Sequence, residues 1–328
     1  MLKHFHQVIL NTTQAHSLFE IETIQSLWSG YGKIIRYGLD QSDIKSVVVK
    51  HIKLPSQNKH PRGWNTDLSH QRKLKSYQIE TAWYQHWNHL CSDACKTPDC
   101  LAVEYKDDEI IIVLQDLNQT GFPTLKTTAS LNEIKSCLKW LANFHATFIN
   151  FKPDDLWEVG TYWHLETRPD ELKCLKDKAL KNAAELIDKK LNATLFKTIV
   201  HGDAKLANFC FSEDGNHVAA VDFQYVGGGC GMKDVAYFIG SCLDENQCEQ
   251  FESSLLDFYF HSLKDALTLQ QKEIDIKLLE KDWRALYPFA WTDFHRFLKG
   301  WSPGHWKIHS YSERLSREVI AQLDNSVK

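Results

Sequence analysis

The sequence contains no apolar run long enough to span a membrane. A transmembrane helix needs about 18 or more consecutive apolar residues, and polar side chains interrupt every hydrophobic stretch of the 328 residues well before that length. Residues 1–14, MLKHFHQVILNTTQ, also lack the apolar segment and small-residue cleavage site of a secretory leader. We therefore expect a protein that has no membrane partner and works in the cytoplasm.

The chain also lacks a strong charge of either sign. It has 38 Lys and Arg against 42 Asp and Glu, which gives a net charge of −4. Nucleic-acid binding relies on an excess of Lys and Arg at the phosphates, so we expect no nucleic-acid partner. Internal repeats and low-complexity tracts are absent, and 43% hydrophobic with 24% charged residues is an ordinary globular composition. The length allows one large domain or two lobes.

The chain also lacks two matching pairs of cysteines of the kind that build a structural zinc site. The nine cysteines are an odd number, and a chain of this size does not need disulfides for stability, so we expect free thiols in a reducing compartment. One group of residues has side chains that bind zinc in other proteins: His86, His89, Cys91, Cys95 and Cys100. Structural zinc prefers tight Cys-x2-4-Cys pairs with a matching second half. Here the pairs are loose and the matching second half is absent, so we favour free thiols and keep zinc as the alternative.

The first 117 residues have the pattern of strands around one helix. Short β-rich runs at 33–37 and 46–52 and the apolar run at 110–114 predict strands. Residues 68–90 contain neither Gly nor Pro and carry large apolar side chains, which predicts a helix.

After residue 117 the pattern is mainly helical. Apolar residues spaced by three and four predict helices over 131–150 and 171–191, and from Val235 nearly to the end. Two short β runs, 209–211 and 218–221, flank a turn sequence. We therefore predict an α+β protein with a β-rich N-terminal lobe, residues 1–117, and a larger helical C-terminal lobe, residues 118–328.

The most specific pattern is His-Gly-Asp-Ala-Lys-Leu-Ala-Asn at 201–208, followed after the predicted hairpin by Asp-Phe-Gln from Asp222. Phosphoryl transfer mainly requires positioning and charge neutralisation. Asp203 is placed to accept or orient the proton of a substrate hydroxyl. Asn208 and Asp222 supply the hard oxygen ligands that Mg²⁺ prefers. A His-Gly-Asp triplet alone is a common turn, but the residues that follow it argue against chance.

The N-terminal part provides an independent check. Lys50 ends a β-branched strand, as does the lysine that binds the α- and β-phosphates of ATP in kinases. Glu80 is the only acid between Asp67 and Asp93, and we expect it to hold that lysine from the helix. Gly30 and Gly32, just before the first predicted strand, form either a short phosphate-covering loop or an ordinary turn.

These motifs resemble the aminoglycoside phosphotransferase and choline kinase superfamily, which has the protein-kinase-like fold. The Gly after His201, and Gln224 where protein kinases have Gly, point to the ecdysteroid-kinase-like (CHK kinase-like) branch. The resemblance covers about residues 30–238. It implies a bilobal structure that binds ATP and Mg²⁺.

The resemblance also implies roles for individual residues. Lys205 is expected to contact the transferred phosphate. Gln115 and Leu117 are expected in the hinge between the lobes, where the main chain contacts adenine, although Gln115 stands where the family commonly has Glu. Asp234 is expected to anchor the backbone of the catalytic loop.

The acceptor is predicted to bind near an aromatic-rich segment after residue 280. Trp291, Asp293 and Trp301 are the candidate acceptor residues, suited to an apolar or cationic alcohol. The alternative is that these aromatic residues are core and that Asp293 pairs with Arg296, three residues along the helix.

The sequence thus predicts an ATP-dependent phosphotransferase that phosphorylates a hydroxyl group of a small molecule. A pseudokinase that serves as a scaffold is one alternative, but it would not need Lys50, Glu80, Asp203, Asn208 and Asp222 together. A protein kinase is the other, and it is disfavoured because no long activation segment follows Asp222. The oligomeric state is left open.

Overall fold

The computed structural model describes residues 2–27, 30–53 and 67–326. No helix within these ranges is both long and apolar enough to cross a membrane.

The N-terminal part is built on an antiparallel sheet with the strand order β1-β2-β3-β5-β4. Apolar residues alternate between its two faces along β5, where Ile111 and Val113 pack on one side and Ile110 and Ile112 on the other. Because both faces are covered, β5 is buried along almost its whole length. The five strands are β1 (Ser17–Ser26), β2 (Gly32–Asp40), β3 (Ser46–Lys53), β4 (Cys100–Lys106) and β5 (Glu109–Gln115).

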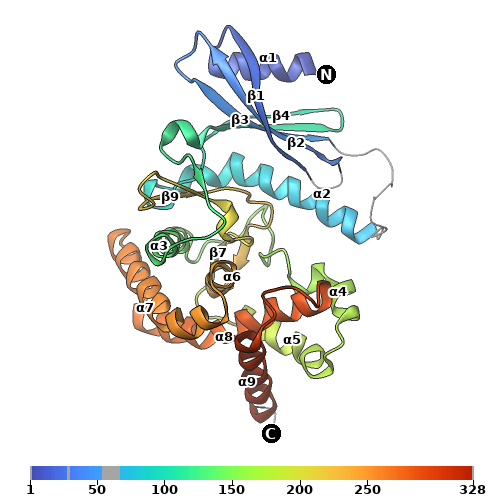
Figure 1. Cartoon of the computed structure of the whole chain (residues 1–328), viewed down its shortest axis with the longest axis vertical. Coiled ribbons are helices and arrows are strands. Elements are labelled where there is room, and N and C mark those ends of the chain that lie inside the picture. Colours follow the sequence, from blue (N-terminus) through green and yellow to red (C-terminus); the bar gives the residue numbers. More distant parts are fainter. Residues whose placement is uncertain (1, 28–29, 54–66, 327–328) are drawn as a thin grey trace.

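Two helices cover the faces of this sheet. Helix α1 (Leu2–Thr13) packs Phe5 and Ile9 on the outer face, and α2 (Asp67–Ala82) lies between the sheet and the helical part of the molecule (Figure 1). A π-helical turn, Trp83–Trp87, and a 3-10 turn, Asn88–Leu90, extend α2. The predicted helix over 68–90 and the three predicted strands are therefore confirmed, whereas α1, β1 and β4 were not predicted.

The C-terminal part is mainly helical. Its first helix is α3, which begins with a capping box formed by Ser130 and Glu133. The helical stretch predicted over 171–191 is present as two helices: the chain breaks after α4, and Asp177 caps a new helix by accepting from Leu180 N. The helices are α3 (Leu131–Thr147), α4 (Pro169–Cys174), α5 (Lys178–Asn192), α6 (Met232–Cys242), α7 (Glu245–Leu269), α8 (Ile276–Trp301) and α9 (Ser310–Ser326).

Five short strands lie in this part, next to α2 and the helical core. The predicted hairpin is present as β8 (Phe209–Phe211) and β9 (Val218–Ala220), with β6 (Thr124–Leu125) alongside, and β7 (Thr198–Val200) pairs with β10 (Gly227–Gly229). The His-Gly-Asp motif follows β7, and Asp222 follows β9. The α+β class is confirmed, and a lobe boundary at residue 117 stays a prediction.

Candidate active site

Three side-chain donors hold the Asp203 carboxylate, two from the segment after β7 and one from α6. Lys205 Nζ lies 2.9 Å and Asn208 Nδ2 lies 3.1 Å from Oδ2, and Tyr237 Oη donates to Oδ1 at 3.1 Å. Gly202 makes this turn possible. Its φ is +79°, and an added Cβ would lie 2.0 Å from the carbonyl oxygen of Tyr225, so no larger residue fits.

The electrostatic environment of Asp203 favours proton uptake. Burial raises its pKa and the neighbouring Asp222 carboxylate acts in the same direction, outweighing the opposing Lys205 ammonium. A carboxylate with a raised pKa is a better proton acceptor. The side chain of Lys205 is 40% exposed, so the loop is open to solvent on that side.

Asp222 lies next to this loop with an unusual backbone conformation. Its φ is +70°, in the left-handed region that costs energy for a residue with a side chain. Burial opposes ionisation of Asp222, but the ammonium groups of Lys50, Lys205 and Lys73 hold its pKa below the usual value. Within the described residues its Oδ1 accepts no hydrogen bond, and 36% of the side chain is exposed.

Asp222 and Asn208 fit a magnesium ion. Asn208 directs its amide nitrogen to the Asp203 carbonyl and carboxylate, at 2.8 and 3.1 Å, which leaves its amide oxygen for a cation. With the ionised Asp222, this gives one neutral and one anionic hard oxygen donor, the type of ligand that Mg²⁺ prefers.

The predicted pair of Lys50 and Glu80 is an ion pair in the structure. Lys50 Nζ lies 2.8 and 2.6 Å from the two carboxylate oxygens of Glu80, and 3.5 Å from Asp222 Oδ1. Lys50 is 4% and Glu80 2% exposed. Although burial lowers it, the pKa of Lys50 is raised overall by the Glu80 and Asp222 carboxylates. Lys50 therefore links the sheet, α2 and the segment after β9.

Sequence reasoning missed Lys73, which lies on the same face of α2. Its Nζ donates to Gln224 Oε1 at 2.8 Å and lies 4.6 Å from the centre of the Tyr77 ring. Burial and the neighbouring Lys50 lower the pKa of Lys73 to about 8. Residues 73, 77 and 80 are spaced by four and three, so a helical projection from Glu80 would have identified Lys73.

Asp234, in the first turn of α6, anchors the catalytic loop as expected. Its carboxylate accepts from His201 N at 2.6 Å and from Gly202 N at 2.9 Å. His145 Nε2 lies 3.1 Å from the same group, and Tyr259 Oη lies 2.8 Å from His145 Nδ1. The loop backbone is thereby tied to the core.

The expected hinge follows β5. Asp116 fixes it by accepting from Arg36 Nε at 2.9 Å and Ser46 Oγ at 2.6 Å. Gln115 N donates to Asp99 O at 2.9 Å, and Leu117 O accepts from Phe122 N at 2.9 Å. Adenine contact by Gln115 and Leu117 stays a prediction.

The candidate glycine loop is a tight turn between β1 and β2. Leu27 N donates to Gly32 O at 2.8 Å, and Gly30 N donates to Leu27 O at 3.3 Å. Residues 28 and 29 lie outside the described ranges. A role of Gly30 and Gly32 at the phosphates stays a prediction.

Two of the three candidate acceptor residues lie in the core. Trp291 is 1% exposed and donates to Tyr287 Oη at 2.8 Å. Asp293 is 1% exposed and lies 2.8 Å from Arg296, so the alternative pairing is the one observed. The acceptor assignment of Trp291 and Asp293 is therefore corrected, because α8 is covered by α4, α5, α6 and α9. Trp301 is 42% exposed.

The histidine and cysteine cluster has no metal-site geometry. Across the described ranges, no group of three or more His, Cys, Asp or Glu side chains could hold a metal ion. All nine cysteines are free thiols. The thiol interpretation of the segment from His86 to Cys100 stays a prediction.

Solved structures with the same fold support the architecture. A microcompartment-associated aminopropanol kinase matches with a TM-score of 0.53 and 11% identity, over 98% of this chain and 94% of that one. An amicoumacin kinase in complex with AMP-PNP, Ca²⁺ and Ami matches with a TM-score of 0.51 and 12% identity, over 99% and 96%. At this identity the matches show the fold, which is bilobal and protein-kinase-like.

Among curated proteins, none matches the sequence. A family model matches the sequence over residues 59–155 and 157–272, which together are more than half of the chain. The chain belongs to the ecdysteroid kinase-like family.

Proposed function

We propose that the protein is an ATP- and magnesium-dependent phosphotransferase that phosphorylates a hydroxyl group of a small molecule. One observation carries the proposal: charged side chains from four separate segments meet at one site. Lys50 of β3 contacts both Glu80 of α2 and Asp222, which follows β9. Asp203 of the loop after β7 is close enough to Asp222 for the Asp222 carboxylate to raise the pKa of Asp203, although burial raises it more.

In the proposed reaction the acceptor hydroxyl approaches Asp203, and its oxygen attacks the γ-phosphorus of ATP. The bond from that phosphorus to the bridging oxygen breaks, Asp203 receives the hydroxyl proton, and ADP leaves. Lys50 binds the α- and β-phosphates, and Lys205 binds the transferred group. Asn208 and Asp222 would hold magnesium, which neutralises charge on the phosphates.

The structural neighbours are consistent with this reaction. By name they are an aminopropanol kinase and an amicoumacin kinase, and the latter was solved with an ATP analogue. Free thiols at all nine cysteines favour a reducing compartment, so we propose the cytoplasm as the site of action.

The alternatives fit this site less well. A scaffolding pseudokinase has no need for the complete set of phosphate- and metal-binding side chains. A protein kinase needs an activation segment after the metal-binding Asp, but only residues 223–231 separate Asp222 from α6.

The test combines nucleotide binding with turnover. Mg-ATP should raise the melting temperature, and ADP release should appear with one member of a panel of amino alcohols, aminoglycosides, hydroxy acids, sugars and sterols. Asp203→Asn should keep Mg-ATP binding but lose turnover by orders of magnitude, because it removes a transition-state interaction. Asp222→Ala should weaken both. Unchanged turnover in Asp203→Asn, or unchanged Mg-ATP affinity in Asp222→Ala, would refute the respective role.

A further inference from the structure

Lys307 is a buried ammonium group without a carboxylate partner. It lies in the 302–309 segment between α8 and α9 and is 8% exposed. Its Nζ lies 4.8 Å from the ring centre of Tyr237 and 5.5 Å from those of Phe294 and Trp306. In the part of the chain that the structure describes, no carboxylate lies within the 4.0 Å of an ion pair with Lys307. A buried charge of this kind normally has a partner.

Tyr237 connects Lys307 to the reactive carboxylate. The ring that faces Lys307 carries the hydroxyl that donates to Asp203 Oδ1. Lys205 and Asn208 contact the other oxygen, Oδ2. Asp203 thus has two sides. Lys205 and Asn208, which are proposed to bind phosphate and metal, lie at Oδ2, and Tyr237 bounds the second side at Oδ1. An acceptor hydroxyl on that second side would lie next to Tyr237 and Lys307, away from Lys205 and Asn208.

This second side is aromatic. Trp163 and Phe294 lie 4.9 and 4.8 Å from the Tyr237 ring, centre to centre, and Tyr162 lies 5.6 Å from it. Arg168 stacks over Tyr162, with its guanidinium carbon 5.8 Å from the ring centre. Trp163, Tyr237 and Phe294 pack on one another in one buried cluster, so they form an apolar backing for Lys307 and not the walls of an open pocket.

Among the described residues, Lys307 is the cation on this side that makes no ion pair. The nearby carboxylates already have partners, since Asp293 pairs with Arg296 at 2.8 Å and Glu171 with Arg168 at 3.1 Å. Burial lowers the pKa of Lys307 to about 8, although the Cys242 thiol and the Asp203 carboxylate favour its charge and Lys205 opposes it. An oxyanion beside Lys307 would favour the charged ammonium group and so offset the lowering of its pKa by burial. A second ammonium group would be repelled in a site of low dielectric.

We propose that Lys307 determines acceptor specificity by binding an oxyanion, a carboxylate or phosphate group, on the acceptor alcohol, and that it excludes amines. The inference rests on the proposed phosphotransferase function. It replaces the cationic acceptor expected from Asp293, whose charge is neutralised by Arg296. Two hydrogen bonds hold the backbone at Lys307: Lys307 N donates to His305 Nδ1 at 3.2 Å, and Ser312 Oγ donates to Lys307 O at 3.3 Å.

The experiment uses probes with one skeleton and different charge. The full chain with Mg-AMP-PNP at pH 7 is titrated with 4-(hydroxymethyl)benzoate, the corresponding phenylphosphonate, the neutral benzamide and the cationic benzylamine. Affinity is measured by calorimetry or ligand-observed NMR. We expect at least one oxyanion to bind ten times more tightly than the benzylamine, and the two oxyanions distinguish carboxylate from phosphate recognition. Equal or tighter binding of the amine, or no binding by any probe, overturns the proposal.

Variants separate recognition from structure. Lys307→Met should reduce the preference for the oxyanion at least tenfold, and Lys307→Arg should restore most of it. Lys135→Met is the matched control, because Lys135 also places its ammonium over a ring, 5.6 Å from Phe258, where α3 packs on α7. An unchanged preference in Lys307→Met refutes the proposal, as does a loss in Lys307→Arg equal to that in Lys307→Met.

The binding readout also separates this proposal from the proposed function. Asp203→Asn should keep the oxyanion preference even though it abolishes turnover. A wild-type chain that binds oxyanions but transfers no phosphoryl group would support the Lys307 assignment and refute the function. Turnover of an amino alcohol with no turnover of its hydroxy-acid analogue would support the function and refute the Lys307 assignment.

Discussion

Replacing Asp234 by Asn should detach the catalytic loop from α6, although the two side chains have nearly the same size. Asp234 is fully buried, and its two oxygens accept from the backbone N–H groups of His201 and Gly202. An Asn side chain can offer only one oxygen to these two donors. Its amide nitrogen would then face the second N–H, donor against donor.

The magnitude follows from these contacts. A hydrogen bond to a charged group contributes about 1.5–3 kcal/mol, and a buried N–H left unpaired costs about 1–3 kcal/mol. Relaxation of the loop offsets part of this loss, so we expect Asp234→Asn to lower the free energy of unfolding by about 3 kcal/mol. For a chain of this size, about 2 °C of melting temperature per kcal/mol gives a decrease of about 6 °C.

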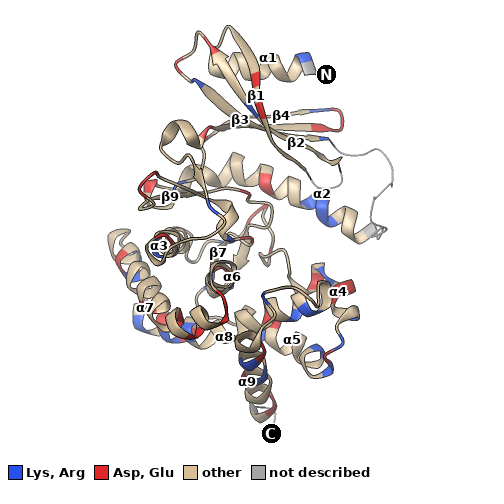
Figure 2. Ribbon diagram, in the orientation of Figure 1, with Lys and Arg blue, Asp and Glu red and all other residues tan. Residues whose placement is uncertain are grey.

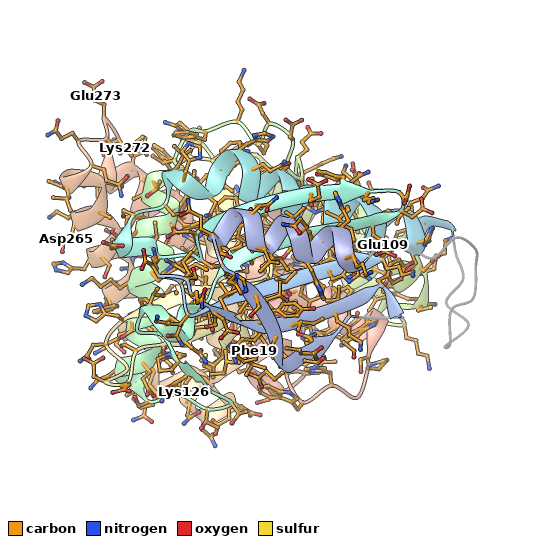
Figure 3. All side chains as sticks on the ribbon, turned by 90° about the horizontal axis from the view of Figure 1, so that it is seen from above. Phe19, Glu109, Lys126, Asp265, Lys272 and Glu273 are labelled. Carbon is orange, nitrogen blue, oxygen red and sulfur yellow. The ribbon has the colours of Figure 1, made fainter. Side chains whose placement is uncertain are left out.

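Turnover should fall more than stability suggests. Asp203 is one residue beyond Gly202, and a shift of about 1 Å in a reacting group costs roughly a hundredfold in rate. The assay is thermal unfolding together with ADP release on the acceptor found in the screen. Asp265→Asn is the control, because Asp265 projects from the surface near the end of α7 (Figure 3) and is 66% exposed. A variant that melts within about 1 °C of wild type and keeps full turnover would refute this account.

Two further predictions concern carboxylates. Glu80→Gln removes the anion that holds Lys50 and should weaken Mg-ATP binding about tenfold, or about 1.4 kcal/mol, by calorimetry; unchanged affinity would show that the ion pair does not position Lys50. Burial raises the pKa of Glu252 from 4.5 to about 7, although Arg314 and the hydrogen bond with Tyr287 act to lower it. The stabilising contribution of Glu252 is therefore complete below pH 4.5 and is lost as pH rises through 7. Glu252→Gln should therefore exceed wild type in stability at pH 8 by about 1–2 kcal/mol, after allowance for partial exposure, and match it near pH 4 in denaturant melts; equal stability at pH 8 would contradict the assignment.

The parts of the fold that sequence reasoning predicted are those with local signals. β5 is a continuous apolar run, and the residues around Asp203 and Asn208 lie within one short loop. The Lys50–Glu80 pair was found because Glu80 is isolated among uncharged and basic neighbours. Such signals depend on spacing within one segment, which the sequence shows directly.

The elements that were missed have weaker or misleading signals. Residues 19–22 of β1 alternate apolar and polar side chains, but eight of the ten residues of the strand are exposed, so the alternation marks no buried face. The interruption between α4 and α5 depends on one side-chain cap at Asp177, which competes with an otherwise continuous helical pattern. Trp291 and Asp293 were misassigned because an aromatic stripe looks the same in a core as in a pocket wall. Only the packing of α8 distinguishes the two.

The contact of Lys73 with Gln224 bears on how the site is assembled. In protein kinases the residue after Asp-Phe is Gly, which has no side chain to bond, and the position of the helix that carries the Glu is a point of control. Here the Gln224 amide oxygen accepts from Lys73 at 2.8 Å and from Ser76 Oγ at 3.3 Å, so α2 is joined directly to the segment that carries Asp222. Figure 2 shows that the basic turns of α2 lie in the first half of the helix.

The same helix is held a second time, seven residues later, by the Glu80–Lys50 ion pair. Two attachments on one face fix both the position of α2 along its axis and its rotation about it. Displacing α2 would break a buried ion pair and leave Gln224, which is 6% exposed, without its donors. Because each loss costs more than an ordinary surface contact, we expect the arrangement of Lys50, Glu80 and Asp222 to form together with the fold.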